Sequence, residues 1–376
     1  MKKMSYIIVE TLLVFILFFL PIVRSTDNAK LAIPAEKAKL ASWFDSTFGA
    51  ASTVKTASLK PVALSGAAAA TGKAGPPKLI TVKKDGSGNF KTLTDAIKSI
   101  PSGNKQRVIV SIGPGNYTEK VTIPRDKPFI TLYGDPKNMP VFVYGGTAAK
   151  YGTVDSATLS AESDNFTCVN VKVVNCAPRP DGKIVGAQAA AVRVGGDSAV
   201  FYNCKFYGYQ DTVFDYKGRH LFKDCYIEGT VDFIFGSAKS VYLNTEIHVI
   251  PGDPMSIIAA HAREKDAEDT GFIFVHCSVT GTGRTAVLGR SWFPYPRVVY
   301  AFCDLSDVVK PEGWSNNFHP ETNSTVFFGE YNNRGPGSNL EKRVKFAKKL
   351  SPNEAKPFTN LGYIDAASWL GPPIKL

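Results

Sequence analysis

The sequence predicts an all-β solenoid, a parallel β-helix with a short N-terminal capping helix. The prediction rests on short β-branched and aromatic segments between turn residues, on a repeat of about 20 residues that these segments share, and on the near absence of helical periodicity. Strands and turns that repeat without crossover helices are typical of a coil whose turns stack on one another. A sandwich or barrel is disfavoured because hairpin signals such as Asn-Gly are few.

The repeat can be superposed on one residue of each coil. These residues are Val171, Cys204, Cys225, Thr245, Cys277 and Cys303, with spacings of 33, 21, 20, 32 and 26 residues. Small apolar side chains at one phase of every coil stack inside the core, so Cys204 and Cys225 should be neighbours. An oxidising compartment permits a disulfide there, but a ladder of free thiols gives the same pattern, so the pairing stays open.

One segment, residues 92–101, has a helical pattern. Thr92 is placed to cap the helix together with Asp95, and Pro101 ends it. Its apolar residues fall on one helical face: Leu93, Ala96, Ile97 and Ile100. Such a helix would cover the open end of the coil.

The chain divides into a leader, an extension and one large domain. Residues 1–25 carry two lysines before an apolar run over 7–20, which is typical of a secretory signal. A membrane anchor is the alternative, because residues 7–23 are only just long enough to span a bilayer. Residues 26–77, rich in Ala, Lys, Ser and Thr, are expected to be an extension and flexible linker, and residues 78–376 the β-helix domain.

The formal net charge of +11 predicts attraction to a polyanion, either nucleic acid or an acidic polysaccharide. No basic tract with interleaved aromatic residues and no Cys/His finger argues for nucleic acid. The histidines lack metal-binding spacing, so no metal is expected. Glycosylation acceptors at Asn116, Asn165 and Asn323 agree with export.

Two aspartates occupy the same phase of consecutive coils, because Asp211 follows Cys204 by 7 residues and Asp232 follows Cys225 by 7. Stacked strands place equivalent residues about 4.8 Å apart. At that distance two unit charges repel by roughly 3.5 kcal/mol at an effective dielectric constant near 20. One carboxyl should therefore be neutral and the other charged, as a general acid beside a nucleophile requires. The structural alternative is an aspartate ladder that caps turn amides.

Amide and guanidinium groups accompany these aspartates. Gln210 lies beside the first of them, and Gln188 lies 22 residues earlier, about one coil back. Primary amides can donate hydrogen bonds to a developing oxyanion. Arg290 could keep Asp232 ionised, and Trp292 could offer a stacking face to a sugar ring.

The motifs and their order resemble those of plant pectinesterases over about four fifths of the chain. The shared segments are DGSGNF (85–90), GNYTE (115–119), GAQAAAVR (186–193), GYQDT (208–212), GTVDFIFG (229–236), LGRSW (288–292), PEGWSNN (311–317) and FGEYNNRGPGS (328–338). The resemblance implies a right-handed parallel β-helix that removes methyl groups from the galacturonate esters of homogalacturonan, releasing methanol and pectate. It implies no cofactor.

The resemblance also implies the catalytic roles. Asp232 would attack the ester carbonyl while Gln188 and Gln210 stabilise the tetrahedral oxyanion. Asp211 would protonate the departing methanol and then activate the water that hydrolyses the acyl-enzyme anhydride. Arg290 would hold Asp232 in place.

Substrate stacking would fall to Trp292, Trp314 and Phe233. The family usually has proline where this chain has Ser291, so the loop that presents Trp292 is expected to be less rigid. The short N-terminal extension resembles the type without an inhibitor-like pro-region. The implied protein is a secreted monomer of the cell wall that acts on methyl-esterified homogalacturonan. A proteinaceous pectinesterase inhibitor is its candidate partner, and neither nucleic acid nor, after signal cleavage, a membrane is expected to bind.

Other function classes compete with this interpretation. A β-helix pectate lyase or polygalacturonan hydrolase would share the fold, but such lyases generally need calcium and no acidic calcium cluster is evident. A non-catalytic pectate-binding protein would share the charge. Gly196-Asp197-Ser198 suggests a serine esterase and Asp269-Thr270-Gly271 an aspartic protease, but the first lacks a GxSxG elbow and the second occurs once.

Overall fold

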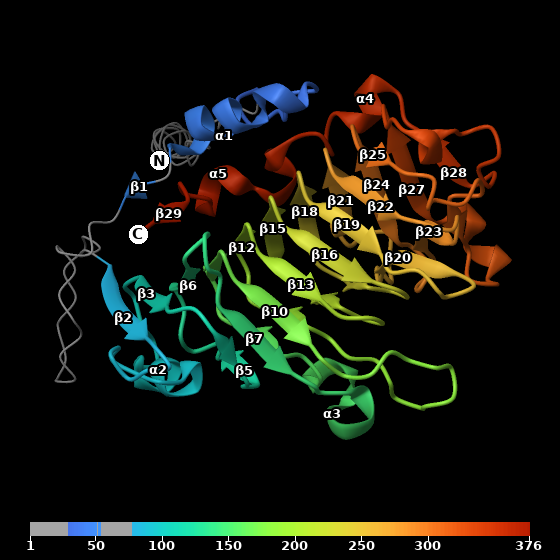
Figure 1. Cartoon of the computed structure of the whole chain (residues 1–376). Coiled ribbons are helices and arrows are strands. Elements are labelled where there is room, and N and C mark those ends of the chain that lie inside the picture. The colour runs from blue at the N-terminus through green and yellow to red at the C-terminus, as the bar shows by residue number, and fades with distance from the viewer. Residues whose placement is uncertain (1–28, 51, 54–76) are drawn as a thin grey trace, which may run out of the picture.

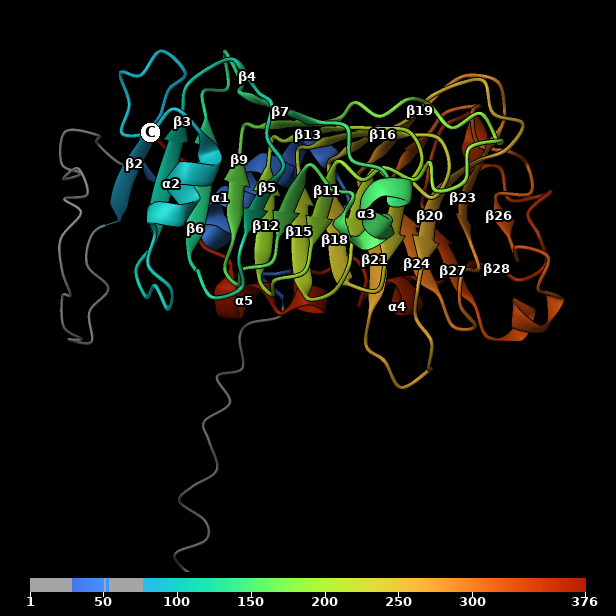
Figure 2. The ribbon, with the colours of Figure 1, turned by 90° about the horizontal axis from the view of Figure 1, so that it is seen from below.

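The computed structural model describes residues 29–50, 52–53 and 77–376, whose strands wind into a coil of three long parallel sheets (Figures 1 and 2). Most coils add one strand to each sheet, and the neighbouring strands in the three sheets pair in parallel. The parallel β-helix that the repeat predicts is therefore confirmed.

We name the sheets the long sheet, the second sheet and the site sheet. The long sheet is 11-stranded and contains β2 (Lys78–Val82), β3 (Val108–Ile112), β6 (Ile130–Gly134), β9 (Thr167–Val169), β12 (Ala199–Tyr202), β15 (Arg219–Lys223), β18 (Lys239–Leu243), β21 (Gly271–Val275), β24 (Arg297–Ala301), β27 (Phe327–Tyr331) and β28 (Ala347–Lys349). The second sheet is 8-stranded and contains β4 (Asn116–Tyr117), β7 (Val141–Tyr144), β10 (Lys172–Asn175), β13 (Lys205–Tyr207), β16 (Tyr226–Gly229), β19 (Glu246–Val249), β22 (Ser278–Gly281) and β25 (Asp304–Leu305). The site sheet is also 8-stranded and contains β5 (Val121–Ile123), β8 (Leu159–Ala161), β11 (Val192–Val194), β14 (Val213–Asp215), β17 (Ile234–Gly236), β20 (Ser256–His261), β23 (Ala286–Arg290) and β26 (Trp314–Ser315).

The strand register reproduces the ladder expected from the repeat. Lys205 pairs with Tyr226, which places the preceding residues, Cys204 and Cys225, on adjacent coils. The other ladder residues are related in the same way. All 6 cysteines are unpaired, and Cys176 alone among them is exposed. The ladder therefore consists of buried free thiols together with Val171 and Thr245.

In four successive coils a left-handed turn residue leads from the long sheet into the second sheet. In Asn170, Asn203, Asp224 and Asn244 the angle φ is between 49° and 57°, a conformation that Asn and Asp tolerate best after glycine. The side-chain amide of Asn203 donates to Asn170 Oδ1 (2.9 Å), and that of Asn244 donates to Asp224 Oδ1 (2.6 Å). These bonds between coils help to fix the register.

Aromatic rings stack through the core at the same spacing. The rings of Phe201, Phe222, Tyr242, Phe274 and Tyr300 form a column in which successive centroids lie 4.4 to 4.8 Å apart. That distance matches the separation of neighbouring strands, so each coil adds one ring to the column.

The helix α2 (Leu93–Ser99) covers the N-terminal end of this core, as the sequence predicts (Figure 1). The Thr92 hydroxyl accepts a hydrogen bond from the Asp95 N–H (3.1 Å). The apolar face of the helix is buried with residues of β2 and β5 in the main core.

Residues 29–50, expected to belong to an extension and linker, pack against the outer face of the long sheet. They form α1 (Leu40–Phe48) and bury Leu31, Ile33, Leu40 and Phe44 against that sheet. Residues 1–28, which include the predicted signal peptide, and 54–76, which include most of the predicted linker, lie outside the described residues. No helix in the described ranges combines the length and apolar character needed to cross a membrane.

The C-terminal segment covers the same face of the long sheet (Figure 1). It contains α4 (Pro352–Ala355) and α5 (Ala366–Trp369), and its last strand, β29 (Ile374–Lys375), pairs with β1 (Ser52–Thr53). Residues 52–53 and the C-terminal strand therefore lie side by side. Figure 2 shows α3 (Ala148–Asp155) on the side of the coil facing away from α1.

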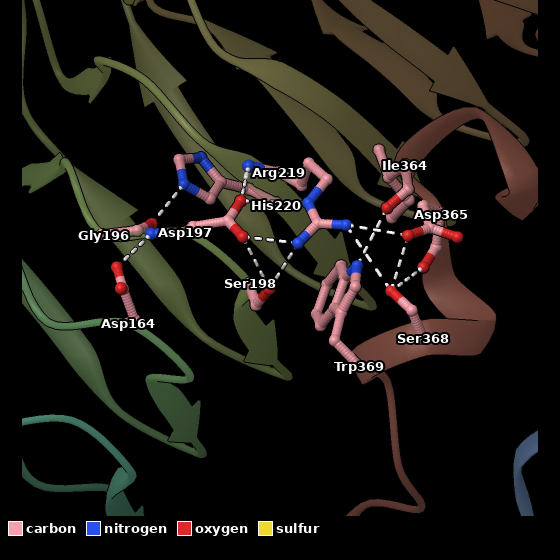
Figure 3. Close-up of polar contacts among 10 residues, drawn as sticks. All are labelled: Asp164, Gly196, Asp197, Ser198, Arg219, His220, Ile364, Asp365, Ser368 and Trp369. Carbon is pink, nitrogen blue, oxygen red and sulfur yellow. Dashed lines mark hydrogen bonds and ion pairs between the residues drawn. The ribbon is translucent and has the colours of Figure 1, made fainter. Parts of the chain in front are cut away.

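A polar network centred on Arg219 fastens the C-terminal segment to the coil (Figure 3). The Arg219 guanidinium donates to Asp197 Oδ2 (2.5 Å) and to Asp365 Oδ2 (2.9 Å). Burial raises the pKa of Asp197, but the hydrogen bonds from Arg219 and Ser198 outweigh it and lower the pKa to about 2. Asp197 therefore remains charged and holds Arg219 in position.

If α1 is an integral part of the fold, Phe44→Ala should lower the free energy of unfolding by about 3 kcal/mol, because it leaves a cavity under the helix. The Phe44 side chain is only 2% exposed. Urea denaturation measures the change, with Asp45→Ala on the exposed face of α1 as the control. A loss below about 1 kcal/mol in Phe44→Ala would show that this segment adds little to stability.

Candidate active site

Two carboxyl groups lie opposite each other on adjacent coils of the site sheet. Val213 of β14 pairs with Ile234 of β17, so Asp211 and Asp232, each two residues earlier, are in register. The side chains are buried, and both residues have a left-handed backbone, with φ of 70° and 49°.

A cavity of about 410 Å³ opens over this pair. The residues that the sequence assigned to catalysis all line it, and one of the three assigned to substrate stacking does. They are Gln188, Gln210, Asp211, Asp232, Arg290 and Trp292. Strands β11, β14, β17 and β23 thus bring together side chains that lie up to 104 residues apart in the sequence.

Arg290 binds one oxygen of Asp232 and leaves the other free. Its guanidinium forms an ion pair with Asp232 Oδ2 and donates to Asn317 Oδ1 (2.9 Å). Asp232 Oδ1 is buried and has no hydrogen-bond partner in the part of the chain that the structure describes. A carboxylate oriented by a charge on one oxygen, with a bare second oxygen, is suited to nucleophilic attack.

The two aspartates differ in their electrostatic environment. Burial raises the pKa of Asp211 well above its ordinary range, and the neighbouring charge of Asp232 raises it further, while Arg290 opposes both effects. Burial also raises the pKa of Asp232 above its ordinary value, but the charge of Arg290 and its hydrogen bond to the carboxylate oppose this effect, so the pKa of Asp232 rises less than that of Asp211. Asp211 therefore holds the proton, and Asp232 carries the charge.

The two glutamines are positioned through their main chains. The Gln188 carbonyl accepts from the Ala148 N–H of α3 (2.8 Å), and the Gln210 carbonyl accepts from the Ala189 N–H (3.2 Å). Neither side-chain amide makes a hydrogen bond to any residue in the described ranges. Both amides can therefore donate to an anion in the cleft.

Aromatic residues of the cleft include several that the sequence analysis missed. Phe214 and Phe235 line it with their rings stacked, the centroids 4.5 Å apart, and Tyr216 and Phe293 line it as well. Phe214 and Phe235 each follow a site aspartate by 3 residues. The repeat that aligned the aspartates could therefore have identified this pair too.

The predictions for Phe233 and Trp314 are corrected by their burial. Phe233 has no exposed area and packs in the main core, and Trp314 is 2% exposed. The Trp314 ring stacks on Phe328 (4.6 Å), and its indole N–H donates to Glu330 (3.0 Å). Both rings face the interior, so neither can stack on a sugar in the cleft. Of the three residues predicted to stack on a sugar, Trp292 is the one that is exposed, with 52% of its surface accessible. Its ring lies 4.8 Å from the Arg290 guanidinium.

Ser291 gives the loop before Trp292 two restraints of its own. Its N–H donates to the Ser315 carbonyl (3.0 Å), and its hydroxyl donates to the Phe293 carbonyl (2.9 Å). Proline, which the family usually has at this position, has no N–H group to make the first of these bonds. Hydrogen bonds thus replace the stiffness of a proline ring.

The competing motifs lie outside the cleft. Ser198 contacts Asp197 and Arg219, and one ring nitrogen of His220 bonds to the Gly196 carbonyl (2.8 Å) (Figure 3). The other ring nitrogen bonds to Asp215 (2.5 Å), so the serine and the histidine are not paired. Asp269 is exposed and pairs with Lys239 (2.5 Å). Across the described ranges, no group of three or more His, Cys, Asp or Glu side chains is arranged to hold a metal.

The protonated Asp211 should reduce stability at neutral pH. An unfolded chain releases this proton near the ordinary pKa of 3.8, whereas the folded protein retains it to a higher pH. Folding stability therefore falls as the pH rises from 3.8 toward the folded pKa, and remains reduced above it. Asp211→Asn should raise the melting temperature by about 2 °C or more at pH 7, with little difference near pH 3. Circular dichroism measures the shift, and an unchanged or lower melting temperature at pH 7 contradicts the assignment.

Comparison with known proteins identifies relatives of this chain. The family model described as Pectinesterase matches residues 79–367. Pectinesterase 1 of Olea europaea is 56% identical over 98% of each chain, and a pectinesterase of Parthenium hysterophorus is 57% identical over 98% of each. The structure of a pectin methylesterase from carrot superposes with a TM-score of 0.73 at 30% identity, covering 81% of this chain and 97% of the other. This chain belongs to the pectinesterase family.

Proposed function

We propose that this protein hydrolyses the methyl esters of pectin to pectate and methanol. The observation that carries the proposal is the pair of buried carboxyl groups on adjacent coils, of which Asp211 is neutral and Asp232 is charged and partly unpartnered. The basic net charge of +11 favours encounter with an acidic polysaccharide. Membership of the pectinesterase family supports the same substrate.

In the first step, Asp232 Oδ1 attacks the carbonyl carbon of the methyl ester while Arg290 keeps hold of Oδ2. The amides of Gln188 and Gln210 donate to the oxygen that becomes negative. Collapse of this intermediate breaks the bond to the methoxy oxygen, which takes the proton of Asp211. Methanol leaves, and the galacturonyl group is joined to Asp232 as an anhydride.

In the second step, Asp211 is a carboxylate and acts as the base. It takes a proton from a water molecule, whose oxygen attacks the galacturonyl carbonyl of the anhydride. The bond to Asp232 breaks, and its carboxylate is again stabilised by Arg290. The product carboxyl group is formed, and Asp211 ends the cycle with its proton restored.

Trp292 at the exposed edge of the cleft provides a stacking face for a sugar. From the sequence, we also propose that the protein is secreted to the cell wall, is a monomer and binds a proteinaceous inhibitor. Cleavage of the polymer by a lyase or hydrolase has no feature in the cleft that favours it over ester hydrolysis.

Asp232→Asn should lower the rate of methanol release from esterified pectin by at least about a thousandfold, because the amide cannot replace the carboxylate nucleophile. A coupled alcohol oxidase assay measures methanol. Asp224→Asn is the matched control, since Asp224 also has a left-handed backbone but lies outside the cleft. Ordinary activity in Asp232→Asn would falsify the assignment of the nucleophile.

Arg290→Gln should shift the acidic limb of the pH profile of kcat/KM to higher pH. The guanidinium lowers the pKa of Asp232, so its removal leaves more Asp232 protonated and inactive at a given acidic pH. Methanol release measured across the pH range gives the limb. Arg334→Gln, at an exposed pair with Asp304, is the control. An acidic limb that stays in place would contradict the proposed ion-pair role.

A further inference from the structure

One charged residue of the cleft has no part in the proposed reaction. Asp211, Asp232 and Arg290 form the catalytic group, and Glu264 is the other charged side chain among the described residues that line the cavity. It is exposed, and its carboxylate makes no hydrogen bond or ion pair within the described ranges. A bare carboxylate in a cleft that receives an acidic polymer calls for a physical explanation.

Glu264 lies away from the reacting ester. Phe235 of β17 pairs with Ala260 of β20, so Glu264 comes after the carboxyl ends of these strands. Asp232, in contrast, precedes the first residue of β17. Ser237 and Trp292 line the cleft near the strand ends where Glu264 is found. Glu264 therefore borders a position for a sugar other than the one whose ester is cleaved.

The backbone at Glu264 is held by its neighbour Arg263, whose side chain is only 2% exposed. The Arg263 guanidinium donates to the Glu268 carbonyl (2.7 Å), the Tyr295 carbonyl (3.2 Å) and Asp266 Oδ1 (2.9 Å). The Tyr295 N–H returns a bond to the Arg263 carbonyl (3.1 Å). These bonds tie the segment after β20 to the loop that carries Trp292, so Glu264 is fixed at the cleft wall.

The surroundings of Glu264 leave its negative charge unopposed within the cleft. Ala260, Ala262 and Phe293 line the cavity with it and carry no charge. Arg290 is already engaged by Asp232, and Lys265 does not line the cavity. An apolar wall with one carboxylate repels a second carboxylate but accepts an uncharged methyl ester.

We propose that Glu264 is a specificity-determining residue that favours a methyl-esterified sugar over free galacturonate at this position. The inference rests on the proposed function. A sugar carboxylate about 8 Å from Glu264, at an effective dielectric constant of about 40, is disfavoured about fivefold. The overall positive charge thus draws the polymer to the protein, while Glu264 directs the cleft toward stretches that are still esterified.

The test compares the full-length wild type with Glu264→Gln and Glu264→Lys on pectins of high and low methyl esterification. For Glu264→Gln, the ratio of kcat/KM on high-ester to low-ester pectin should fall about fivefold, and inhibition by unesterified oligogalacturonate should strengthen by a similar factor. Glu264→Lys should change both in the same direction and by more. The differences between these variants and the wild type should shrink in about 0.5 M salt.

Glu312→Gln removes an equally exposed carboxylate that does not line the cleft, and it should behave as wild type. The inference is overturned if Glu264→Gln keeps the wild-type ratio and inhibition constant, or if its effects persist unchanged in high salt. Wild-type protein that releases no methanol from high-ester pectin would instead overturn the proposed function, so the two failures are distinguishable.

Discussion

The proposed active site depends on the register between neighbouring coils. Because Val213 lies opposite Ile234, two carboxyl groups that are 21 residues apart in the sequence face each other. A slip of one residue would separate them and turn one side chain toward the other face of the sheet. The hydrogen-bonded turn residues Asn203 and Asn170 and the stacked rings of the core oppose such a slip. The interactions that stabilise the coil therefore also align the proposed catalytic groups.

This register creates an electrostatic imbalance on which the chemistry depends. Two buried carboxyl groups one strand apart cannot both ionise without a large penalty, and Arg290 determines which of them does. Beyond the aspartate pair, Arg290 also contacts Trp292 at the rim of the cleft, and Glu264 places a negative charge on a separate part of the cleft wall. The cleft thus combines a nearly neutral proposed catalytic centre with a negatively charged flank, in a protein of net positive charge.

Sequence periodicity was sufficient for features that repeat with the coil, such as the aspartate pair and the cysteine ladder. Local chemistry was sufficient for α2, because Thr92 and Pro101 mark its ends. The direction in which a single aromatic side chain points could not be predicted from the sequence periodicity. Phe233 precedes β17 and follows the left-handed Asp232, so strand alternation does not extend to it, and it points inward while Phe235 lines the cleft. The packing of residues 29–50 was also missed, because only the tertiary structure shows that the long sheet has an apolar outer face to cover.

The central claim is that Asp211 keeps its proton at a pH at which Asp232 is already a carboxylate. Carbon-13 NMR of protein labelled at the aspartate carboxyl groups measures this directly as a function of pH. The account predicts that, as the pH rises, the Asp232 resonance is the first to take the chemical shift of a carboxylate. The Asp211 resonance, assigned by its loss in a variant, still has the chemical shift of a neutral carboxyl group at that pH. Independent titration of both groups near the ordinary aspartate pKa of 3.8 would contradict it.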